Sequence, residues 1–361
     1  MNISSGSETD QRRVGWICTY VPEELIHAAG FQPVRLLPGY AGNEKDVDDL
    51  LPASICPFIR QVLGSIRSEI YDNLEGIVVA QSCNGMMHLY NALQAEFKGF
   101  VYLLDIPRKK DREAVSYFTG ELDMFLAELE NRNGPVNNET LTASLNLYGR
   151  RTSLIHELLD KYDGSLNKFH HSGPYGMAEE AASLPPSAFI DKAETFLENT
   201  AEDQPGQKSG RPALLLSGGV PSQGLVGMLS SVTDLKLYPE TCTGLRYLLR
   251  PPIDHADPEE RDRNKILELI AHNYLTKPPC PRLLDAPARK NYYQKLIENL
   301  NIKAAVYHDL MFCDLCHYDY LILKEVPEQK NVPCLKVKTG LGHEDSGQLQ
   351  TRVEAFLEII Q

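Results

Sequence analysis

The sequence lacks the features that mark secreted, membrane-spanning and nucleic-acid-binding proteins. Its first ten residues have neither the basic nor the apolar stretch of a secretory signal, so we expect a cytoplasmic protein. The longest uncharged stretch, residues 212–233, is interrupted by Gly218, Gly219 and Pro221, which indicates strand, turn and helix rather than a membrane span. Acidic side chains outnumber basic ones by 49 to 36. We therefore expect no membrane or nucleic-acid binding, since phosphate contacts require clustered Lys and Arg.

Common nucleotide and metal motifs are also missing. Residues 218–224 follow a predicted strand and open a predicted helix, so their N–H groups are suited to a phosphate or carboxylate. They depart from the dinucleotide motif and lack the P-loop lysine, so neither a dinucleotide nor ATP is expected there. Cys313 and Cys316 form the only C-x-x-C pair, which excludes a zinc ribbon, and their spacing does not match a compact ferredoxin either.

The composition that remains is typical of a folded protein with one unusual feature. The 361 residues suggest two domains, or three, and are enough to bury a core without disulfides or metals. Hydrophobic residues make up 42% and charged residues 24%, which excludes disordered, fibrous and channel proteins. The unusual feature is eight cysteines. In a reducing compartment these serve as core residues, metal ligands or catalysts.

Short apolar runs alternate with amphipathic stretches, the pattern of βαβ units around a parallel sheet. Residues 14–110 form a predicted first α/β domain. Residues 111–200 have helical spacing and form a predicted helical insert, and residues 201–210 have the composition of a linker. Residues 211–361 form a predicted second α/β domain. The fold class is therefore α/β, with two Rossmann-like parallel-sheet domains and a helical insert.

The individual elements follow from the same pattern. Strands are predicted at 14–20, 34–37, 76–80, 100–104, 213–217, 234–238, 304–308 and 332–337. Helices outside the insert are predicted at 22–30, 57–69, 84–97, 222–231, 258–274, 285–300, 317–328 and 348–360. The two halves look alike in plan, although no sequence repeat joins them.

The cysteines fall where predicted strands end. Cys83, Cys242 and Cys313 each lie shortly beyond a predicted strand, at the edge where open parallel sheets bind ligands. Cys56, Cys83 and Cys313 also lie at predicted helix starts, where backbone N–H groups favour the thiolate that iron and zinc require. A cluster bound between the two halves is one hypothesis. The alternative for any single cysteine is that it packs in the core as a small apolar residue.

Other candidate residues have ordinary structural explanations. Glu23 and Glu24 are candidate acid–base residues, but the helix dipole alone explains acids in a first helical turn, and we favour that explanation. His170 and His171 fit a loop better than a ligand pair. The basic run at 108–110 is suited to a nucleotide phosphate, and a solvated charge run explains it at least as well.

A set of segments is distinctive in combination. In chain order they are CTYVPEELIHAAG (18–30), CPFIR (56–60), SC (82–83), LDIPR (104–108), SGGVPS (217–222), ETCTGLRY (240–247), PCPR (279–282), FCD (312–314) and SGQLQTRVEAFL (346–357). Together they resemble the 2-hydroxyacyl-CoA dehydratase D-component family, which also contains benzoyl-CoA reductase subunits. One segment alone would be weak, but the ordered set is specific.

The resemblance implies two Rossmann-like domains with a [4Fe-4S] cluster between them, held by Cys56, Cys83 and Cys313. Three thiolates leave one iron open to substrate. Further candidate ligands are Cys18, Cys242, Cys280 and Cys316, which would suit the double-cubane [8Fe-9S] cluster of some relatives. Cys334 is expected to be a core residue.

The function implied by the resemblance is that of an iron–sulfur subunit that removes water from an (R)-2-hydroxyacyl-CoA. The β-hydrogen of this thioester is not acidic, so ordinary acid–base elimination is blocked. One added electron forms a ketyl radical that expels hydroxide. The β-hydrogen can then be removed as a proton, and return of the electron leaves the enoyl-CoA. A related second subunit, forming a heterodimer, and an ATP-dependent iron–sulfur activator are the implied partners. Alternatives are a benzoyl-CoA reductase-type or double-cubane reductase subunit, a non-catalytic iron–sulfur electron-transfer partner, and an α/β binding protein whose cysteines are core.

Three positions depart from the family pattern. Asn84 replaces the usual Asp after the second cysteine, and Cys316 adds a thiol after the third. Residues 336–340 replace a stretch in which an acidic residue is expected. These departures leave open which acyl chain is bound and whether the subunit is catalytic or a relay.

Overall fold

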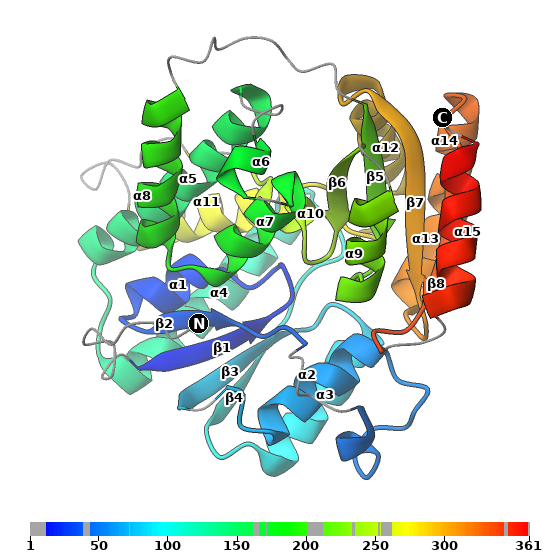
Figure 1. Ribbon diagram of the computed structural model, residues 1–361. Coiled ribbons are helices and arrows are strands. Elements are labelled where there is room, and N and C mark those ends of the chain that lie inside the picture. The colour runs from blue at the N-terminus through cyan, green and yellow to red at the C-terminus, as the bar shows by residue number, and fades with distance from the viewer. Residues whose placement is uncertain are drawn as a thin grey trace.

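Two parallel sheets organise the chain (Figure 1). The first has the strand order β2-β1-β3-β4 and the second β6-β5-β7-β8, and every neighbouring pair is parallel. The prediction of an α/β fold with two parallel sheets is confirmed. The strands are β1 Arg13–Ile17, β2 Gln32–Arg35, β3 Leu74–Ala80, β4 Phe100–Leu104, β5 Ala213–Gly218, β6 Lys236–Thr241, β7 Ile302–Leu310 and β8 Cys334–Thr339. The structure, a computed structural model, describes residues 12–38, 44–71, 73–161, 166–170, 172–200, 212–232, 235–251, 253, 262–342 and 346–359.

The first sheet is covered by helices on both faces, because its central strand is apolar on both sides. Ile77 and Val79 of β3 pack with α2 and α3, whereas Val78 and Ala80 pack with α1 and α4. The elements of this part are α1 Glu23–Ala28, the short 3-10 helix η1 Glu44–Val47, α2 Pro57–Arg67, α3 Asn84–Glu96 and α4 Arg112–Asn133.

The second sheet repeats this plan. Leu214 and Leu216 of β5 pack with α9 and α15, and Leu215 faces the side covered by α12, α13 and α14. Both sheets place their first strand between the second and the third, so the order of connections is the same in each half. The helices are α9 Gln223–Val232, α12 Ala286–Asn299, α13 Asp314–Leu323, α14 Glu325–Gln329 and α15 Ser346–Glu358.

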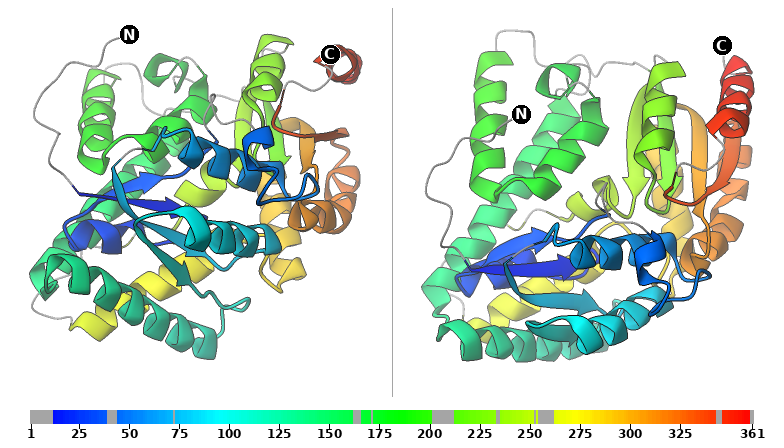
Figure 2. Two further views of the ribbon diagram at one scale, coloured as in Figure 1. Left: turned by 90° about the horizontal axis from the view of Figure 1, so that it is seen from below. Right: turned by 60° about the horizontal axis from the view of Figure 1, so that its bottom comes forward.

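Along the chain, residues 112–200 connect the first sheet to the second. The described residues of this stretch contain helices and turns, in agreement with the predicted helical spacing. Besides α4, they form α5 Asn138–Lys161, α6 Leu166–Phe169, α7 Gly173–Ser183 and α8 Pro186–Thr200. Two further helices follow β6, namely α10 Leu245–Leu248 and α11 Arg263–Thr276. Figure 2 shows α11 lying along α4, so a helix from the second half of the sequence is packed beside the first sheet.

Several predicted boundaries are wrong, each for a local reason. β1 ends at Ile17 rather than residue 20, because Cys18 has a φ of 80° and leaves the extended conformation. The predicted helix at 317–328 is two helices, α13 and α14, because Pro327 has no N–H to continue the hydrogen-bond ladder. The strand predicted at 234–238 corresponds to β6, which begins and ends two to three residues further along the chain, at Lys236–Thr241. The linker predicted at 201–210 lies outside the described residues. Among the described helices, none combines the length and apolar character needed to cross a membrane.

Candidate functional site

Seven of the eight cysteines gather where the carboxyl ends of the two sheets meet. Cys18 packs against the apolar clusters on both faces of the first sheet, and Cys313 packs against the cluster that contains α2 and α3. Cys242 interacts electrostatically with Cys280, Cys313 and Cys18, although Cys18 follows a strand of the first sheet and Cys280 follows a helix. The fold thus brings together thiols that are far apart in sequence. The gathered residues are Cys18, Cys56, Cys83, Cys242, Cys280, Cys313 and Cys316.

Three of these cysteines occupy equivalent positions at the starts of helices, and we call them the helix-start thiols. Cys56, Cys83 and Cys313 are the N-cap residues of α2, α3 and α13, and none of their side chains closes a capping hydrogen bond. The starts of α2 and α3 lie close together at Gly85. A Cβ there would lie 3.0 Å from the Ile59 Cγ1 atom, which is tight, and in ordinary contact with the Cys56 Cβ at 3.6 Å. The first-turn N–H groups of three helices therefore surround the helix-start thiols.

Two of the helix-start thiols, Cys56 and Cys313, are hydrogen-bonded to each other, and Cys313 is also hydrogen-bonded to Cys316. The Cys313 and Cys316 sulfurs are 3.4 Å apart, and Cys56 also forms a hydrogen bond with Cys313. Hydrogen bonding with Cys316 and Cys56 lowers the pKa of Cys313 well below its ordinary value, and the same interactions raise the pKa values of Cys56 and Cys316. Burial raises the pKa of Cys83 to about 12, which backbone N–H groups partly oppose. The hydrogen bonds thus favour negative charge on the Cys313 sulfur over that of its neighbours.

Three other cysteines lie in turns, and we call them the turn thiols. Cys18 follows β1, Cys242 follows β6, and Cys280 lies in the turn after α11. Burial raises the pKa of Cys242 to about 12 and also raises the pKa of Cys280, and the charge of Arg246 opposes both shifts. Arg246 places its Nη1 atom 3.5 Å from the Cys242 sulfur. Two of the turn thiols, Cys242 and Cys280, therefore lie near a buried guanidinium group.

Two more buried cations lie beside the turn thiols. Lys277 donates to the backbone oxygen of Thr19 and, over 2.6 Å, to its hydroxyl, and its Nζ atom lies 3.7 Å from the centre of the Tyr20 ring. Burial lowers the pKa of Lys277 to about 7, and electrostatic interaction with Cys18 and Cys280 opposes this shift. Arg282 donates to the carbonyl oxygens of Ile106, over 2.7 Å, and Pro107, over 2.6 Å. Arg282 thus fixes the Cys280 turn to the carboxyl edge of the first sheet.

This donor set fits an iron–sulfur cluster better than a single metal ion. Among the described residues, no three His, Cys, Asp or Glu side chains converge closely enough to hold one ion. A cluster binds each thiolate through a different iron, so it suits thiols that are gathered without converging on one point. The hydroxyls of Tyr20 and Thr241 are buried beside the turn thiols and have no hydrogen-bond partner among the described residues. Such donors, together with the buried cations, suit an anionic acceptor.

Cys334 lies apart from the other seven. It is the first residue of β8 and pairs with Ala305 near the start of β7, whereas Cys313 lies beyond the end of β7. Cys334 therefore lies toward the amino end of the second sheet, where it packs against the apolar core. Its electrostatic neighbour is Glu328.

The surroundings of Glu23 and Glu24 were not anticipated by either explanation drawn from the sequence, acid–base chemistry or the helix dipole. Both carboxylates are buried, Glu23 paired with Arg151 and Glu24 with Arg250 at 3.1 Å. Tyr247 donates to Glu23, and Tyr274 donates to Glu24 over 2.7 Å. These ion pairs join α1 to α5, α10 and α11. The sequence conceals them because their partners are separated by more than a hundred residues.

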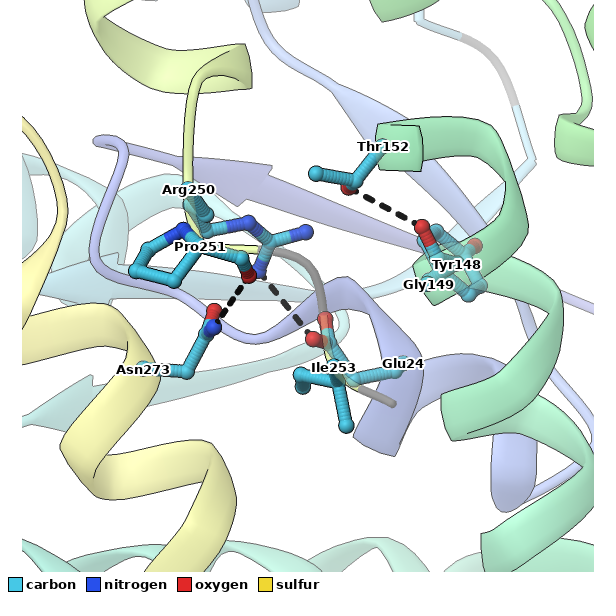
Figure 3. A pocket seen from close by; sticks show the side chains of 8 residues that line it. All are labelled: Glu24, Tyr148, Gly149, Thr152, Arg250, Pro251, Ile253 and Asn273. Carbon is cyan, nitrogen blue, oxygen red and sulfur yellow. Dashed lines mark hydrogen bonds and ion pairs between the residues drawn. The ribbon is translucent and has the colours of Figure 1, made fainter. Parts of the chain in front are cut away.

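A small pocket adjoins the second of these ion pairs (Figure 3). Its cavity volume is about 10 Å³, far below the range of typical ligand sites, so an acyl-CoA does not fit there. The polar side chains that line it are already paired: Arg250 with Glu24, and Asn273 with the Pro251 carbonyl oxygen over 2.6 Å. The lining residues are Glu24, Tyr148, Gly149, Thr152, Arg250, Pro251, Ile253 and Asn273.

The remaining sequence candidates have structural roles or lie on the surface. Gly218 has a φ of 105°, and a Cβ on Gly219 would lie 3.0 Å from the Cys316 sulfur, so the glycine pair allows close packing at the end of β5. The basic run at 108–110 is exposed, and its Lys110 pairs with Asp285 at 2.8 Å. His170 accepts a hydrogen bond from the Ser172 backbone over 3.2 Å. His171 lies outside the described residues.

Comparison with known proteins identifies the family. The family model for the 2-hydroxyglutaryl-CoA dehydratase D-component matches residues 18–360. The chain belongs to this family. Its D-component relatives include the (R)-phenyllactyl-CoA dehydratase beta subunit of Clostridium sporogenes, which is 20% identical over 98% of this chain and 93% of that protein.

Two further relatives show the range of names within the D-component family. A putative dehydratase subunit of Escherichia coli is 24% identical over 96% of this chain and 91% of its own length. A benzoyl-CoA reductase subunit of Thauera aromatica is 22% identical over 95% of this chain and 89% of its own length. The family predicted from the ordered segments is confirmed, and the chain is an enzyme subunit of the dehydratase type.

Proposed function

We propose that this chain is the iron–sulfur subunit of a 2-hydroxyacyl-CoA dehydratase. The observation that carries the proposal is the convergence of the helix-start thiols Cys56, Cys83 and Cys313 from two sheets. These residues would hold a [4Fe-4S] cluster that neither half of the chain could hold alone. When bound, the cluster supplies one-electron redox chemistry. The names of the family and of its dehydratase relatives support the reaction class.

The chain's own residues make the site favourable for negatively charged sulfur. The starts of α2, α3 and α13 contribute backbone N–H groups and the positive ends of their dipoles. Arg246 adds a buried charge close to Cys242. Ile59 and Met86, both buried in the first turns of α2 and α3, exclude water from the base of the site. Low water content strengthens each of these electrostatic interactions.

The proposed reaction is loss of water from an (R)-2-hydroxyacyl-CoA to give the enoyl-CoA. The β-hydrogen of this thioester is not acidic, so the elimination requires an electron from outside the substrate. We assign its delivery to an ATP-dependent iron–sulfur activator. In this proposal the enzyme also needs a related second subunit, because its relatives are themselves named as single subunits of dehydratases and of a benzoyl-CoA reductase.

A subunit of a double-cubane or benzoyl-CoA reductase-type enzyme is the second candidate. The observation that favours it is the closeness of the turn thiols and Cys316 to the helix-start thiols. This larger set would supply ligands for an [8Fe-9S] cluster. The benzoyl-CoA reductase protein among the relatives supports the same alternative.

Iron and sulfide analysis distinguishes the two candidates. The chain is purified without oxygen, together with its co-expressed partner subunit, and iron and acid-labile sulfide are measured per chain. The [4Fe-4S] assignment predicts about four irons, and about eight would support the double-cubane assignment instead. A colourless preparation free of iron would contradict both and leave the cysteines as core residues.

The catalytic claim has a separate test. The reduced complex with its activator and ATP is mixed with (R)-2-hydroxyacyl-CoA thioesters, and enoyl-CoA formation and the paramagnetic resonance spectrum are followed. We expect product and a substrate-dependent change in the spectrum. If iron is present but neither signal changes with any thioester, the chain is an electron-transfer partner and not a dehydratase subunit.

A further inference from the structure

Two buried side chains beside the turn thiols have hydrogen-bond donors that are not used within the described residues. Tyr20 lies two residues after Cys18, is 0% exposed, and its hydroxyl has no partner among the described residues. Lys277 lies three residues before Cys280 and is 2% exposed. The two groups are adjacent, because the Lys277 Nζ atom lies 3.7 Å from the centre of the Tyr20 ring.

The hydrogen bonds of Lys277 account for only part of its ammonium group. An ammonium has three N–H donors. Both bonds that it makes go to Thr19, one to the backbone oxygen and one to the hydroxyl. One donor therefore remains, next to the unpaired hydroxyl of Tyr20. Buried donors normally have partners, so this pair of donors is unusual.

Both groups interact with the same two cysteines. Tyr20 interacts electrostatically with Cys280 and Cys18, and these two cysteines are also the first electrostatic partners of Lys277. Lys277 and Cys280 are three residues apart, and Tyr20 and Cys18 are two residues apart. Arg282 also lies by the Tyr20 ring, with its Cζ atom 5.4 Å from the ring centre, so two cationic side chains lie against one aromatic ring.

The helix-start thiols have a different environment. The main influences on Cys56 and Cys83 are burial, other cysteines and the N–H groups of their own helices. Positive charge is therefore greatest on the side of the turn thiols. Hydrogen bonds and positive charge near the sulfurs of an iron–sulfur cluster stabilise its reduced form, which carries one more negative charge.

We propose that Lys277 and Tyr20 are positioning residues of the iron–sulfur centre, which donate hydrogen bonds to its sulfur on the side of the turn thiols and raise its reduction potential. The inference rests on the proposed function, since it requires a cluster at the gathered thiols. The proposal also implies that the added electron of the reduced centre is stabilised on the side of the site where Lys277 lies.

The test is the reduction potential of anaerobically purified variants in complex with the partner subunit. Lys277→Met removes a charge and a donor at similar length, and we expect the equilibrium constant for one-electron reduction to fall about tenfold, which corresponds to about 59 mV. Tyr20→Phe removes one unpaired hydroxyl, so the fold is retained, and we expect a fall of about threefold. Iron content should stay at the level of the unaltered protein in both variants.

The matched control is Tyr292→Phe. The hydroxyl of Tyr292 is also buried without a partner among the described residues. Its main electrostatic neighbours are Tyr238, Glu240, Arg289 and Arg246, and no turn thiol is among them. The control should leave the potential unchanged. An unchanged potential in iron-loaded Tyr20→Phe, or an equal shift in Tyr292→Phe, overturns the inference, even if Lys277→Met fails to fold. Absence of iron from the unaltered protein would instead overturn the proposed function.

Discussion

The helix-start thiols and the turn thiols use two different ways to stabilise sulfur charge. Cys56, Cys83 and Cys313 rely on helix starts, which supply oriented N–H groups and no net charge. The turn thiols, represented by Cys242, rely on whole charges such as that of Arg246. The first device follows from local sequence, because a helix start needs only its own residues. The second requires cations from other elements, so it exists only in the folded protein.

The helix starts at the thiols also differ from other helix starts of the protein in their capping. Away from the thiols, α4, α11 and α12 begin with Asp111, Asp262 and Asp285, each of which accepts a capping hydrogen bond from its own helix. At the thiols, α2, α3 and α13 begin with cysteines that accept none. Stabilisation from side-chain capping is thus absent at the three helix starts that carry the thiols.

The largest effect is expected from the helix-start thiols themselves. Cys56→Ser, Cys83→Ser and Cys313→Ser should each lose most of the bound iron, because three ligands leave no surplus. Iron per chain, measured after anaerobic purification, is the readout. Cys334→Ser is the control and should keep its iron, because Cys334 lies toward the amino end of the second sheet. Equal losses in all four variants would contradict the assignment.

The turn thiols should respond less. Cys280→Ser is expected to leave about four irons per chain, because the proposed [4Fe-4S] cluster does not require this ligand. Iron and sulfide analysis of the purified variant is the measurement. A fall from about eight irons in the unaltered protein to about four in the variant would show that Cys280 is also a ligand. It would favour the double-cubane assignment.

Breaking a buried ion pair should destabilise the protein without changing the iron content at its thiols. Glu23→Gln leaves Arg151 buried without its carboxylate, at a cost of about 3–5 kcal/mol in the free energy of unfolding. Chemical denaturation measures the change. Iron content of the folded fraction should be unaffected, and a specific loss of iron would show that this ion pair belongs to the thiol site.

The same ion pair has a defined pH dependence. Burial alone would raise the pKa of Glu23, but the charge and hydrogen bond of Arg151 bring it below its ordinary value. The stabilisation is therefore present above the ordinary pKa of Glu23 and is lost as the pH falls through that value toward the lower folded one. The stability of Glu23→Gln should fall less steeply in this acidic range than that of the unaltered protein. Parallel curves would contradict the shift.

The smallest effect is expected at a capped helix. Asp111→Ala removes the hydrogen bond from the Ala114 N–H, 2.9 Å long, at the start of α4, and should lower the free energy of unfolding by about 1 kcal/mol. Asp111→Asn is the control, because its amide oxygen accepts the same bond. Denaturant titration of both variants tests the contrast with the cysteine-capped helices. Equal losses in the two variants would mean that the charge, rather than the cap, is what matters.

Much of the fold was accessible from the sequence because its signals are local. The apolar pattern of Ile77, Val78 and Val79 indicates a strand buried on both faces, and the Pro57 that follows Cys56 indicates a helix start. Boundaries failed where a single backbone conformation decided them, as at Cys18. The burial of Glu23 was not accessible, because Arg151 lies on a distant helix.

The sequence by itself determined the two parallel sheets, the placement of cysteines after strands and at helix starts, and the family to which the chain belongs. These properties depend on periodicity, capping and motif order, which neighbouring residues specify. Only the tertiary structure decided which cations face the gathered cysteines. The contact of Arg246 with Cys242 and the place of Lys277 between Thr19 and Tyr20 arise when the carboxyl edges of two sheets meet. Charges separated along the chain act on one another only after folding has removed the water between them.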